Sequence, residues 1–560
     1  MRALLALVAL TLPACRHNGS AIQRYQSFYL QKASDLPRPE ARASVATVRV
    51  PMSDGVALEA DLLRLPGDAA RPVVLIRTPY ARGYLLPIAD VFASQGYSVL
   101  VQDCRGTGDS EGEFVVMLNE QRDGLDTLAW IDAQPWAGAD VFMFGPSYMG
   151  YTQLAAAVAA PPNLRALVAP ETSAELYQEL YRTGALNLDL ALTWSSFLRT
   201  LTHGKVPIAE ALALQKGWAD LPWGARPLTT LDTEAWGETL PYYQDFVTRT
   251  DAADPYWVET DHLAHVGQAT APAWLATGWH DFALEGTLAI YAGQRAAGLE
   301  PALTIGGGAH GDHDGLTEAI GAAFAWFEAH ATEPLGLDLP DRSAPVRYLV
   351  QGAEVWREAA AWPPPSRPQT VFLQGGGALG SAASGEATPW TYDPADPTPA
   401  VGGAFLLGFD PVADNAPLLA REDVRAFTGP VLDAPLEVAG VPRVSACFGS
   451  DQESADLFVR LSRVDKRGRS WNLTEGLQRV HGLGGAPAPV AFDLKPTAFR
   501  LAPGERLQVI VSSGAAPIWA PNTGAGELAA QATDNTLRVA HQRLEHDAAC
   551  PTTVTLPVTE

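Results

Sequence analysis

The chain has 560 residues and carries 39 Lys and Arg against 63 Asp and Glu, a formal net charge of −24. This length predicts two to four domains, and a composition of 47% hydrophobic and 18% charged residues is typical of a soluble globular protein. The acidic excess argues against a nucleic-acid-binding protein, because phosphate contacts need a surplus of Lys and Arg.

The N-terminal segment has the pattern of an export signal. A basic start, Met1-Arg2, precedes the apolar run Ala3–Leu12, which is too short to span a bilayer. Ala14-Cys15 resembles the cleavage site of a bacterial lipoprotein, in which the Cys is lipidated and begins the mature chain. We therefore expect residues 1–15 to be a lipoprotein-type signal peptide and Cys15 to anchor an exported protein at the periplasmic face or the cell surface. A plain signal peptide with an incidental Cys15 is the alternative.

Three further cysteines remain: Cys104, Cys447 and Cys550. An exported protein can keep disulfides, and an odd number leaves one thiol free. Cys447 and Cys550 both lie in the C-terminal part, so their pairing is one hypothesis. Three buried thiols are the other.

The pattern after the signal changes three times along the chain. Residues 16–44 are polar without clear periodicity, which predicts a tether and a short arm. Apolar runs typical of strands then alternate with helical patterns over residues 45–175. This alternation predicts βαβ units and a mostly parallel sheet. The predicted strands are 48–65 (two, around a turn at 53–55), 73–76, 98–102, 140–144 and 164–169, and the predicted helices are 91–95, 121–133 and 148–160.

Residues 176–265 are rich in Leu, Trp and Tyr at helical spacing and predict a helical cap. The alternation resumes over 266–335, with strands at 273–277 and 302–305 and helices at 285–297 and 316–330. Residues 340–560 contain Pro-rich and Gly-rich stretches between short alternating runs, which predict an all-β sandwich or jelly roll. Examples of these runs are Val346–Val350, Leu457–Leu461 and Leu507–Val511.

One turn carries a candidate nucleophile. Gly145-Pro-Ser147-Tyr-Met-Gly150 follows a predicted buried strand and opens a predicted helix. This is the strand–turn–helix setting of the nucleophile elbow in α/β-hydrolases, where a sharp turn lifts the Ser hydroxyl above the edge of the sheet. We expect Ser147 to be the nucleophile of a serine hydrolase.

A Ser hydroxyl needs a base, and in this fold the acid and then the His follow the nucleophile along the chain. Asp281 follows the predicted strand 273–277 and His310 follows 302–305, so both should lie at the sheet edge where Ser147 lies. We interpret Asp281 as the orienting acid and His310 as the general base. The competitors, which periodicity does not exclude, are His280, Asp312, His313 and Asp314. The last three also hint at calcium, but the set of ligands is too incomplete to predict a metal site.

An oxyanion needs two donors. The backbone N–H of Tyr148, the residue after the nucleophile, is expected to be one of them. The second should come from the loop after the strand 73–76, where Tyr80 offers a hydroxyl. A packed aromatic without a catalytic role is the other interpretation of Tyr80.

Several motifs together resemble the CocE/NonD hydrolases, which include cocaine esterase, α-amino-acid ester hydrolases and X-Pro dipeptidyl-peptidases. The resemblance covers nearly all of the chain from about residue 45. It rests on Arg77–Tyr80, Gln102–Phe114, Trp130–Trp136, Gly145–Gln153, Asp254–Trp257, Asp456–Leu461, Asn472–Gly476 and Pro503–Leu507. It implies an α/β-hydrolase domain with an inserted helical cap and a C-terminal jelly roll.

The resemblance also implies roles for individual residues. Ser147, Asp281 and His310 match the family's nucleophile, acid and base, and Tyr80 matches the tyrosine that completes the oxyanion hole. Two positions depart from the family pattern. Gly307-Gly308-Ala309 replaces the usual Pro-Trp-Ser before the base. Ala283 and Leu284 replace acidic residues that bind the substrate ammonium in α-amino-acid ester hydrolases, although the next residue is Glu285.

We therefore expect a cofactor-free esterase or acylase that acts on a small ester, amide or short peptide with an uncharged acyl group. An X-Pro dipeptidyl-peptidase or an α-amino-acid ester hydrolase is the alternative, and an inactive surface binding protein is a remote one. The sequence predicts no metal and no nucleic-acid partner, and a membrane contact only through Cys15. It does not predict the oligomeric state.

Overall fold

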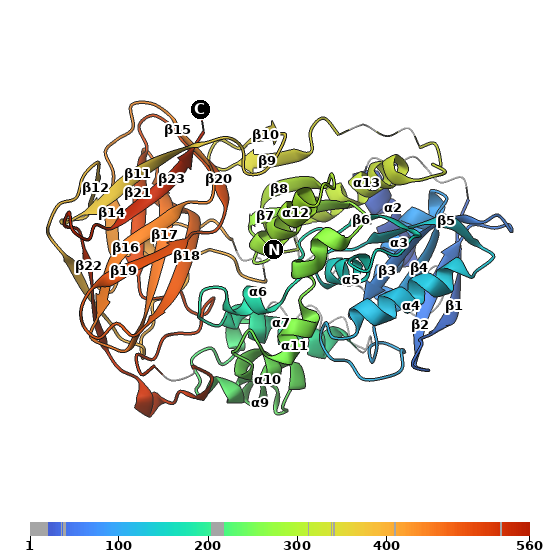
Figure 1. Cartoon of the computed structure of the whole chain (residues 1–560), viewed down its shortest axis with the longest axis horizontal. Coiled ribbons are helices and arrows are strands. Elements are labelled where there is room, and N and C mark those ends of the chain that lie inside the picture. The colour runs from blue at the N-terminus through green and yellow to red at the C-terminus, as the bar shows by residue number, and fades with distance from the viewer. Residues whose placement is uncertain are drawn as a thin grey trace.

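The computed structural model describes residues 21–34, 36, 41–202, 218–311, 313–337, 339, 342–407, 410–526 and 529–559. Cys15 and Asp312 lie outside these residues, and the side chains of His313 and Asp314 are not described. The described chain forms an α/β domain on the right of Figure 1, an all-β domain on the left, and a group of helices below and between them.

The α/β domain is built on a mixed sheet. Among the described residues it has ten strands in the order β1-β2-β4-β3-β5-β6-β7-β8-β9-β10. The seven central strands, β4, β3, β5, β6, β7, β8 and β9, run parallel to one another, while β1, β2 and β10 pair antiparallel at the two edges. The strands are β1 (Ser44–Pro51), β2 (Ala57–Arg64), β3 (Arg71–Thr78), β4 (Ser98–Asp103), β5 (Ala137–Phe144), β6 (Leu164–Val168), β7 (Ala273–His280), β8 (Ala302–Ala309), β9 (Val346–Val350) and β10 (Val355–Ala359).

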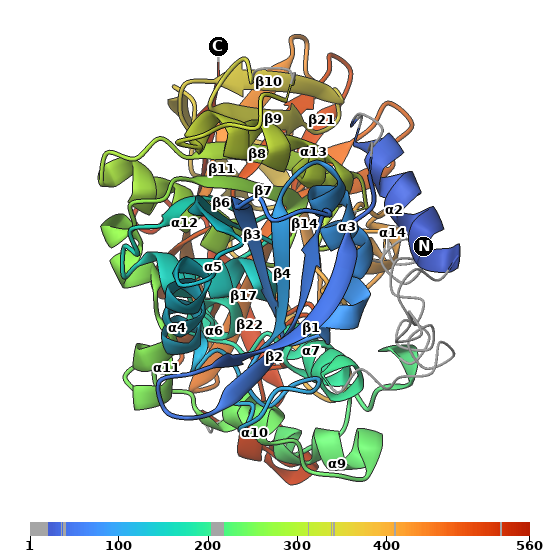
Figure 2. The same ribbon diagram turned by 90° about the vertical axis from the view of Figure 1, so that its right-hand side faces the viewer.

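Helices cover both faces of this sheet. On β3, Val73 and Leu75 pack towards α4, α5 and α12, whereas Val74 and Ile76 pack towards α3 and α13. Burial on both faces explains why these strands are continuous apolar runs rather than alternating ones. Figure 2 shows the two helical layers on either side of the sheet. The helices are α3 (Leu86–Ser94), α4 (Glu120–Asp132), α5 (Tyr148–Ala157), α12 (Leu284–Ala296) and α13 (His313–His330), with the short 3-10 turn η1 (Arg82–Leu85) before α3.

Helical segments fill the chain between β6 and β7, as the Leu-, Trp- and Tyr-rich pattern predicts. Their core includes Trp194, Tyr243, Phe246 and Trp257, and it is continuous with Tyr148 and Tyr151 of the α/β domain. The helical region therefore packs directly over the start of α5. Its elements are α6 (Tyr177–Tyr181), α7 (Leu188–Leu201), η2 (Trp218–Asp220), η3 (Leu228–Thr230), α9 (Leu231–Trp236), α10 (Pro241–Thr248), α11 (Pro255–Thr260) and η4 (Leu263–Gln268).

The C-terminal domain consists mainly of β-strands. Among the described residues, β11 to β23 form a 13-stranded sheet system. Cys447 of β16 and Cys550 are joined by a disulfide, and Cys104 is a buried free thiol. This confirms the hypothesis that the two C-terminal cysteines pair. The strands are β11 (Arg367–Gln374), β12 (Ala378–Gly380), β13 (Thr388–Tyr392), β14 (Arg425–Thr428), β15 (Leu436–Gly440), β16 (Arg443–Ser450), β17 (Ser454–Val464), β18 (Ser470–His481), β19 (Ala488–Asp493), β20 (Thr497–Leu501), β21 (Arg506–Ser512), β22 (Ala540–Glu545) and β23 (Thr553–Val558), and the short helical elements are α14 (Ala416–Leu419), η5 (Ala529–Gln531) and η6 (Asp534–Thr536).

Two segments differ from the sequence-based expectation. Val346–Val350, predicted as a strand of the β domain, instead pairs in parallel with β8 as β9 and extends the first sheet. The Pro- and Gly-rich pattern that marks the β domain surrounds this strand, so composition alone places it on the wrong side of the boundary. In addition, residues Ala21–Ala33 of the predicted arm form a helix, α2. Its buried face includes Gln26, Ser27 and Gln31 beside Leu30, so hydrophobic periodicity did not reveal it.

No helix in the described part of the chain combines the length and the apolar character needed to cross a membrane.

Candidate active site

Ser147 lies at a strained turn between β5 and α5. Its backbone has φ 58° and ψ −127°, a conformation that residues with a Cβ rarely adopt. Neighbouring glycines make room for the turn. A Cβ at Gly145 would lie 2.4 Å from Cβ of Met149, and a Cβ at Gly150 would lie 2.6 Å from Cβ of Thr172. The close packing that the turn needs therefore explains the glycines of the predicted elbow.

The structure brings Ser147, His310 and Asp281 into one hydrogen-bonded chain. Nε2 of His310 lies 3.1 Å from Oγ of Ser147, and Nδ1 of His310 lies 2.9 Å from Oδ1 of Asp281. Asp281 is fully buried at the end of β7 and also accepts from Thr277 Oγ1 at 2.9 Å and from the Ala283 N–H at 2.9 Å. The carboxylate is thus fixed in place, and its lone pair requires the Nδ1–H tautomer of His310, which leaves Nε2 free to accept a proton from Ser147.

The charges of this pair are coupled. Burial opposes ionisation of both groups, but the pKa of His310 is raised because the Asp281 carboxylate stabilises the imidazolium. For the same reason the pKa of Asp281 is lowered despite its burial. The arrangement gives a base that holds a proton more tightly than a free imidazole.

His280, the competitor that immediately precedes Asp281, is buried elsewhere. Its Nε2–H donates to Oε1 of Gln351 at 3.1 Å, and burial lowers its pKa to about 4. His280 is therefore neutral at pH 7 and links the end of β7 to Gln351. It does not contact Ser147 in the structure. Asp312 lies outside the described residues, as do the side chains of His313 and Asp314.

Two groups beside Ser147 are placed to donate to an oxyanion. Tyr148 is the first residue of α5, where a backbone N–H has no partner within the helix. The hydroxyl of Tyr80 accepts a hydrogen bond from the indole N–H of Trp194 at 3.0 Å. Because an indole only donates, the phenolic proton of Tyr80 stays available. Burial raises the pKa of Tyr80 to about 12, against the lowering effect of its hydrogen bonds with Trp194 and Ser147, so the phenol keeps its proton at neutral pH.

Sequence reasoning did not identify Trp194 or Glu120. The hydroxyl of Tyr148 donates to Oε1 of Glu120 at 2.9 Å, and Oε2 of Glu120 lies 3.0 Å from the buried guanidinium of Arg77. The ion pair joins the end of β3, which precedes the loop with Tyr80, to α4, and the hydrogen bond from Tyr148 joins α4 to the helix that follows Ser147. No local pattern marks Glu120, because its partners Cys104, Tyr148 and Arg77 lie 16, 28 and 43 residues away in the chain.

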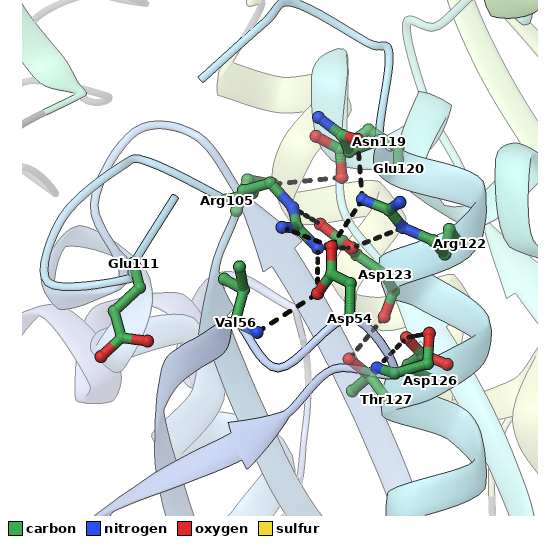
Figure 3. A network of polar contacts seen from close by, with 12 residues as sticks. Asp54, Val56, Arg105, Glu111, Asn119, Glu120, Arg122, Asp123, Asp126 and Thr127 are labelled. Carbon is green, nitrogen blue, oxygen red and sulfur yellow. Dashed lines mark hydrogen bonds and ion pairs between the residues drawn. The ribbon is translucent and has the colours of Figure 1, made fainter. Parts of the chain in front are cut away.

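A second polar network fixes the loop between β4 and α4. Arg105 contacts Asp123 at 2.6 Å and Asp54 at 3.0 Å, and Arg122 contacts Asp54 at 3.1 Å (Figure 3). These ion pairs tie the β1–β2 turn, the loop and α4 together. They fix the start of α4, where Glu120 accepts the hydrogen bond from the Tyr148 hydroxyl.

The β domain contacts the loop that carries Asp281. The amide of Gln351, which receives the hydrogen bond from His280, donates in turn to Oγ1 of Thr497 at 3.0 Å. The ammonium of Lys495 lies 3.4 Å from the carbonyl oxygens of Asp281 and Phe282 and 3.2 Å from Glu285. The position of the acid therefore depends on both domains.

Comparisons with known proteins agree with this architecture. The sequence model described as X-Pro dipeptidyl-peptidase (S15 family) matches residues 54–312, and the X-Pro dipeptidyl-peptidase C-terminal non-catalytic domain matches residues 339–555. Cocaine esterase of Rhodococcus sp. (strain MB1 Bresler) is 30% identical over 577 residues, covering 92% of this chain and 98% of that protein.

The chain belongs to the CocE/NonD family of serine hydrolases. Two solved structures support the fold alone, because each is less than 25% identical. An α-amino acid ester hydrolase superposes with a TM-score of 0.77 at 21% identity, and an aminopeptidase from a marine sediment Thaumarchaeota archaeon with 0.76 at 19%. Each alignment covers 94% of this chain and 98% of the other.

In this CocE/NonD hydrolase a pocket of about 210 Å³ opens beside Ser147. Its wall is mainly apolar and includes Leu190, Trp194, Phe197, Phe282 and Leu407. The helical region supplies much of this wall, since the first three of these residues belong to α7. The pocket can therefore enclose an apolar acyl or leaving group next to the Ser147 hydroxyl.

The pocket also contains three carboxyl groups that the sequence did not single out: Glu171, Glu175 and Glu179. Burial is the main cause that raises the pKa of Glu175 and of Glu179 to about 7. Glu285, in contrast, forms ion pairs with Lys495 at 3.2 Å and Arg182 at 3.5 Å and does not line this pocket. The acidic groups near Ser147 thus come from the segment after β6 rather than from the segment after Asp281.

We predict that the two histidines next to Asp281 in the structure titrate on opposite sides of pH 6.5. His310 should titrate above 6.5, because Asp281 stabilises its charged form, and His280 near 4, because burial destabilises its charged form. Histidine-selective NMR of the intact protein measures both. Asp281→Asn should lower the pKa of His310 and leave that of His280 near 4. An unchanged His310 pKa in this variant would contradict the described pairing.

Proposed function

We propose that the chain hydrolyses a carboxylic ester or amide through an acyl-enzyme on Ser147. The observation that supports this most directly is the continuous hydrogen-bonded chain from Ser147 through His310 to Asp281 at the mouth of an apolar pocket. The proposal assigns the nucleophile to Ser147, the general base and acid to His310, and the orienting charge to Asp281.

In the acylation half, Oγ of Ser147 attacks the substrate carbonyl carbon while its proton passes to Nε2 of His310. The tetrahedral intermediate collapses when His310 gives this proton to the leaving oxygen or nitrogen. In the second half, water attacks the acyl carbon and passes a proton to His310, which returns one to Ser147. Asp281 stays ionised and stabilises the imidazolium in both halves.

Tyr80 and the Tyr148 N–H are proposed to stabilise the negative oxygen of each tetrahedral intermediate. The bond from Trp194 aims the Tyr80 hydroxyl and occupies one of its lone pairs, which leaves its proton for the substrate oxygen. A fixed donor in a site shielded from water gains most when charge develops on the oxygen, so it lowers the barrier rather than only binding substrate.

The preferred substrate in this proposal has an uncharged acyl group. Ala283 stands where α-amino-acid ester hydrolases carry an acidic residue, and the pocket wall is mainly apolar. A second candidate, a substrate with a free α-amino group, is favoured by one observation: Glu171, Glu175 and Glu179 line the same pocket. An ammonium there would keep these carboxyls ionised, whereas a neutral substrate leaves Glu175 and Glu179 partly protonated near pH 7.

We also propose that the protein is exported and anchored through a lipid on Cys15. The support is the sequence pattern of residues 1–15, a basic start, a short apolar run and a small residue before the Cys. Mass spectrometry of the membrane fraction, with Cys15→Ser as the control, tests this assignment independently of catalysis.

Tyr80→Phe should lower kcat by about 10²- to 10³-fold, the usual loss when one oxyanion donor is removed. KM for a p-nitrophenyl ester should change little, because the donor acts mainly on the transition state. Tyr84→Phe is the matched control, because Tyr84 lines the same pocket and this substitution also removes one phenolic hydroxyl. Equal activities of the two variants in steady-state kinetics would remove Tyr80 from the mechanism.

A matched pair of substrates separates the two candidate acyl groups. Phenyl propionate and the phenyl ester of alanine differ by one ammonium, and we expect at least about tenfold higher kcat/KM for the propionate, because the pocket is mainly apolar. Glu179→Gln should change kcat/KM for the propionate by less than about threefold. Preference for the alanine ester or for alanyl-prolyl-p-nitroanilide, together with a large loss of kcat/KM for that substrate in Glu179→Gln, would instead establish a substrate with a free α-amino group.

A further inference from the structure

The helix α2 (Ala21–Ala33) exposes three aromatic side chains on its outer side. Tyr25, Phe28 and Tyr29 are 68%, 51% and 43% exposed, and their spacing of three and four residues places them on one face. The opposite face is buried, with Leu30 in the same core cluster as the buried residues of α3. The three aromatic side chains are thus exposed, in contrast to the face that contains Leu30. Figure 2 shows α2 at the periphery of the molecule, outside α3.

The segment around α2 is basic in an otherwise acidic protein. Residues 16–34 contain Arg16, Arg24 and Lys32 and neither Asp nor Glu, and the first acidic residue of the chain is Asp35. The whole chain has a net charge of −24. The positive charge of this segment favours contact with an anionic surface, which the net charge of the whole chain opposes.

The chain length before α2 limits how far this helix can lie from Cys15. Five residues separate Cys15 from Ala21, and an extended chain covers at most about 3.6 Å per residue, so the span is roughly 20 Å. If Cys15 carries a lipid, as proposed above, the aromatic face is held within reach of the bilayer surface. The inference rests on that proposed anchoring and not on the catalytic assignment.

We propose that α2 is an interfacial helix that rests on an anionic phospholipid bilayer. Tyr25, Phe28 and Tyr29 insert at the level of the headgroups, where amphipathic rings are favoured, and Lys32 contacts lipid phosphate. The helix adds a second attachment to the lipid on Cys15 and fixes which side of the hydrolase faces the membrane.

A second copy of the chain is a poorer occupant for this face. At about 200 Å² per aromatic residue, the three rings expose roughly 300 Å², well below the ~800 Å² per partner of a stable interface. A symmetric partner would also bring a second copy of the basic Lys32 to the same face.

Vesicle sedimentation of the chain from residue 15 onward, with Cys15→Ser, tests the helix without any lipid anchor. We expect binding to vesicles of phosphatidylethanolamine and phosphatidylglycerol, and a loss of at least about tenfold in the combined Tyr25→Ser, Phe28→Ser and Tyr29→Ser variant. Lys32→Glu should weaken binding to these vesicles more than to pure phosphatidylcholine. The matched control replaces three exposed valines of the C-terminal part by Ser: Val412, Val441 and Val539. This control should bind the vesicles as well as the parent chain does.

Ester hydrolysis by all variants, expected to equal that of the parent, shows that each is folded. The proposal fails if the parent chain does not sediment with anionic vesicles, or if the aromatic variant binds as well as the parent. A concentration-dependent dimer that the aromatic substitutions abolish would assign the face to a second copy instead. Vesicle binding does not require turnover, so the anchoring helix and the hydrolase mechanism can fail independently.

Discussion

Ser147 holds φ 58° and ψ −127°, a backbone conformation that costs a non-glycine residue on the order of 1–3 kcal/mol. Its surroundings make this conformation persist: the Ser147 N–H donates to the Pro170 carbonyl at 3.0 Å, and its own carbonyl accepts from Thr172 at 2.8 Å. The strain places Oγ at the sheet edge, next to His310, and places the first N–H of α5 beside it. The geometry of the site follows from this one turn.

The remaining groups of the site come from segments that are far apart in sequence. Trp194 of the helical region aims Tyr80, and Glu120 holds the Tyr148 ring. The β domain reaches the segment around the acid directly through Lys495, and indirectly through Thr497, which accepts from Gln351 beside His280. A domain that matches a model described as non-catalytic thus helps to position Asp281 through the end of β7. We interpret the three structural regions as one unit around Ser147.

The sequence predicts the parts of this site that local chemistry determines. A strand followed by Gly145-Pro-Ser147 predicts the elbow, and Asp281 and His310 each lie in the segment that follows a predicted strand. Trp194 and Glu120 carry no such signal, because their roles depend on contacts across the fold. The same limit applies to the pocket acids: Ala283 and Leu284 suggest a pocket without acidic groups, while the path of the chain after β6 brings Glu175 and Glu179 into it. The strand β9 was predicted as a strand but assigned to the wrong domain, because the composition around it is that of the β domain. The helix α2 was missed because its buried face is partly polar.

The central claim is that His310 and Asp281 activate Ser147 for attack on a carbonyl carbon. A fluorophosphonate reacts with a serine that is activated in this way, and mass spectrometry of the digested protein identifies the modified residue. We predict one adduct, on Ser147, with a labelling rate that rises with pH through the raised pKa of His310, because only the neutral imidazole accepts the proton. Asp281→Asn should slow labelling by about 10³- to 10⁴-fold. An adduct on another serine, or labelling that is independent of Asp281, would contradict it.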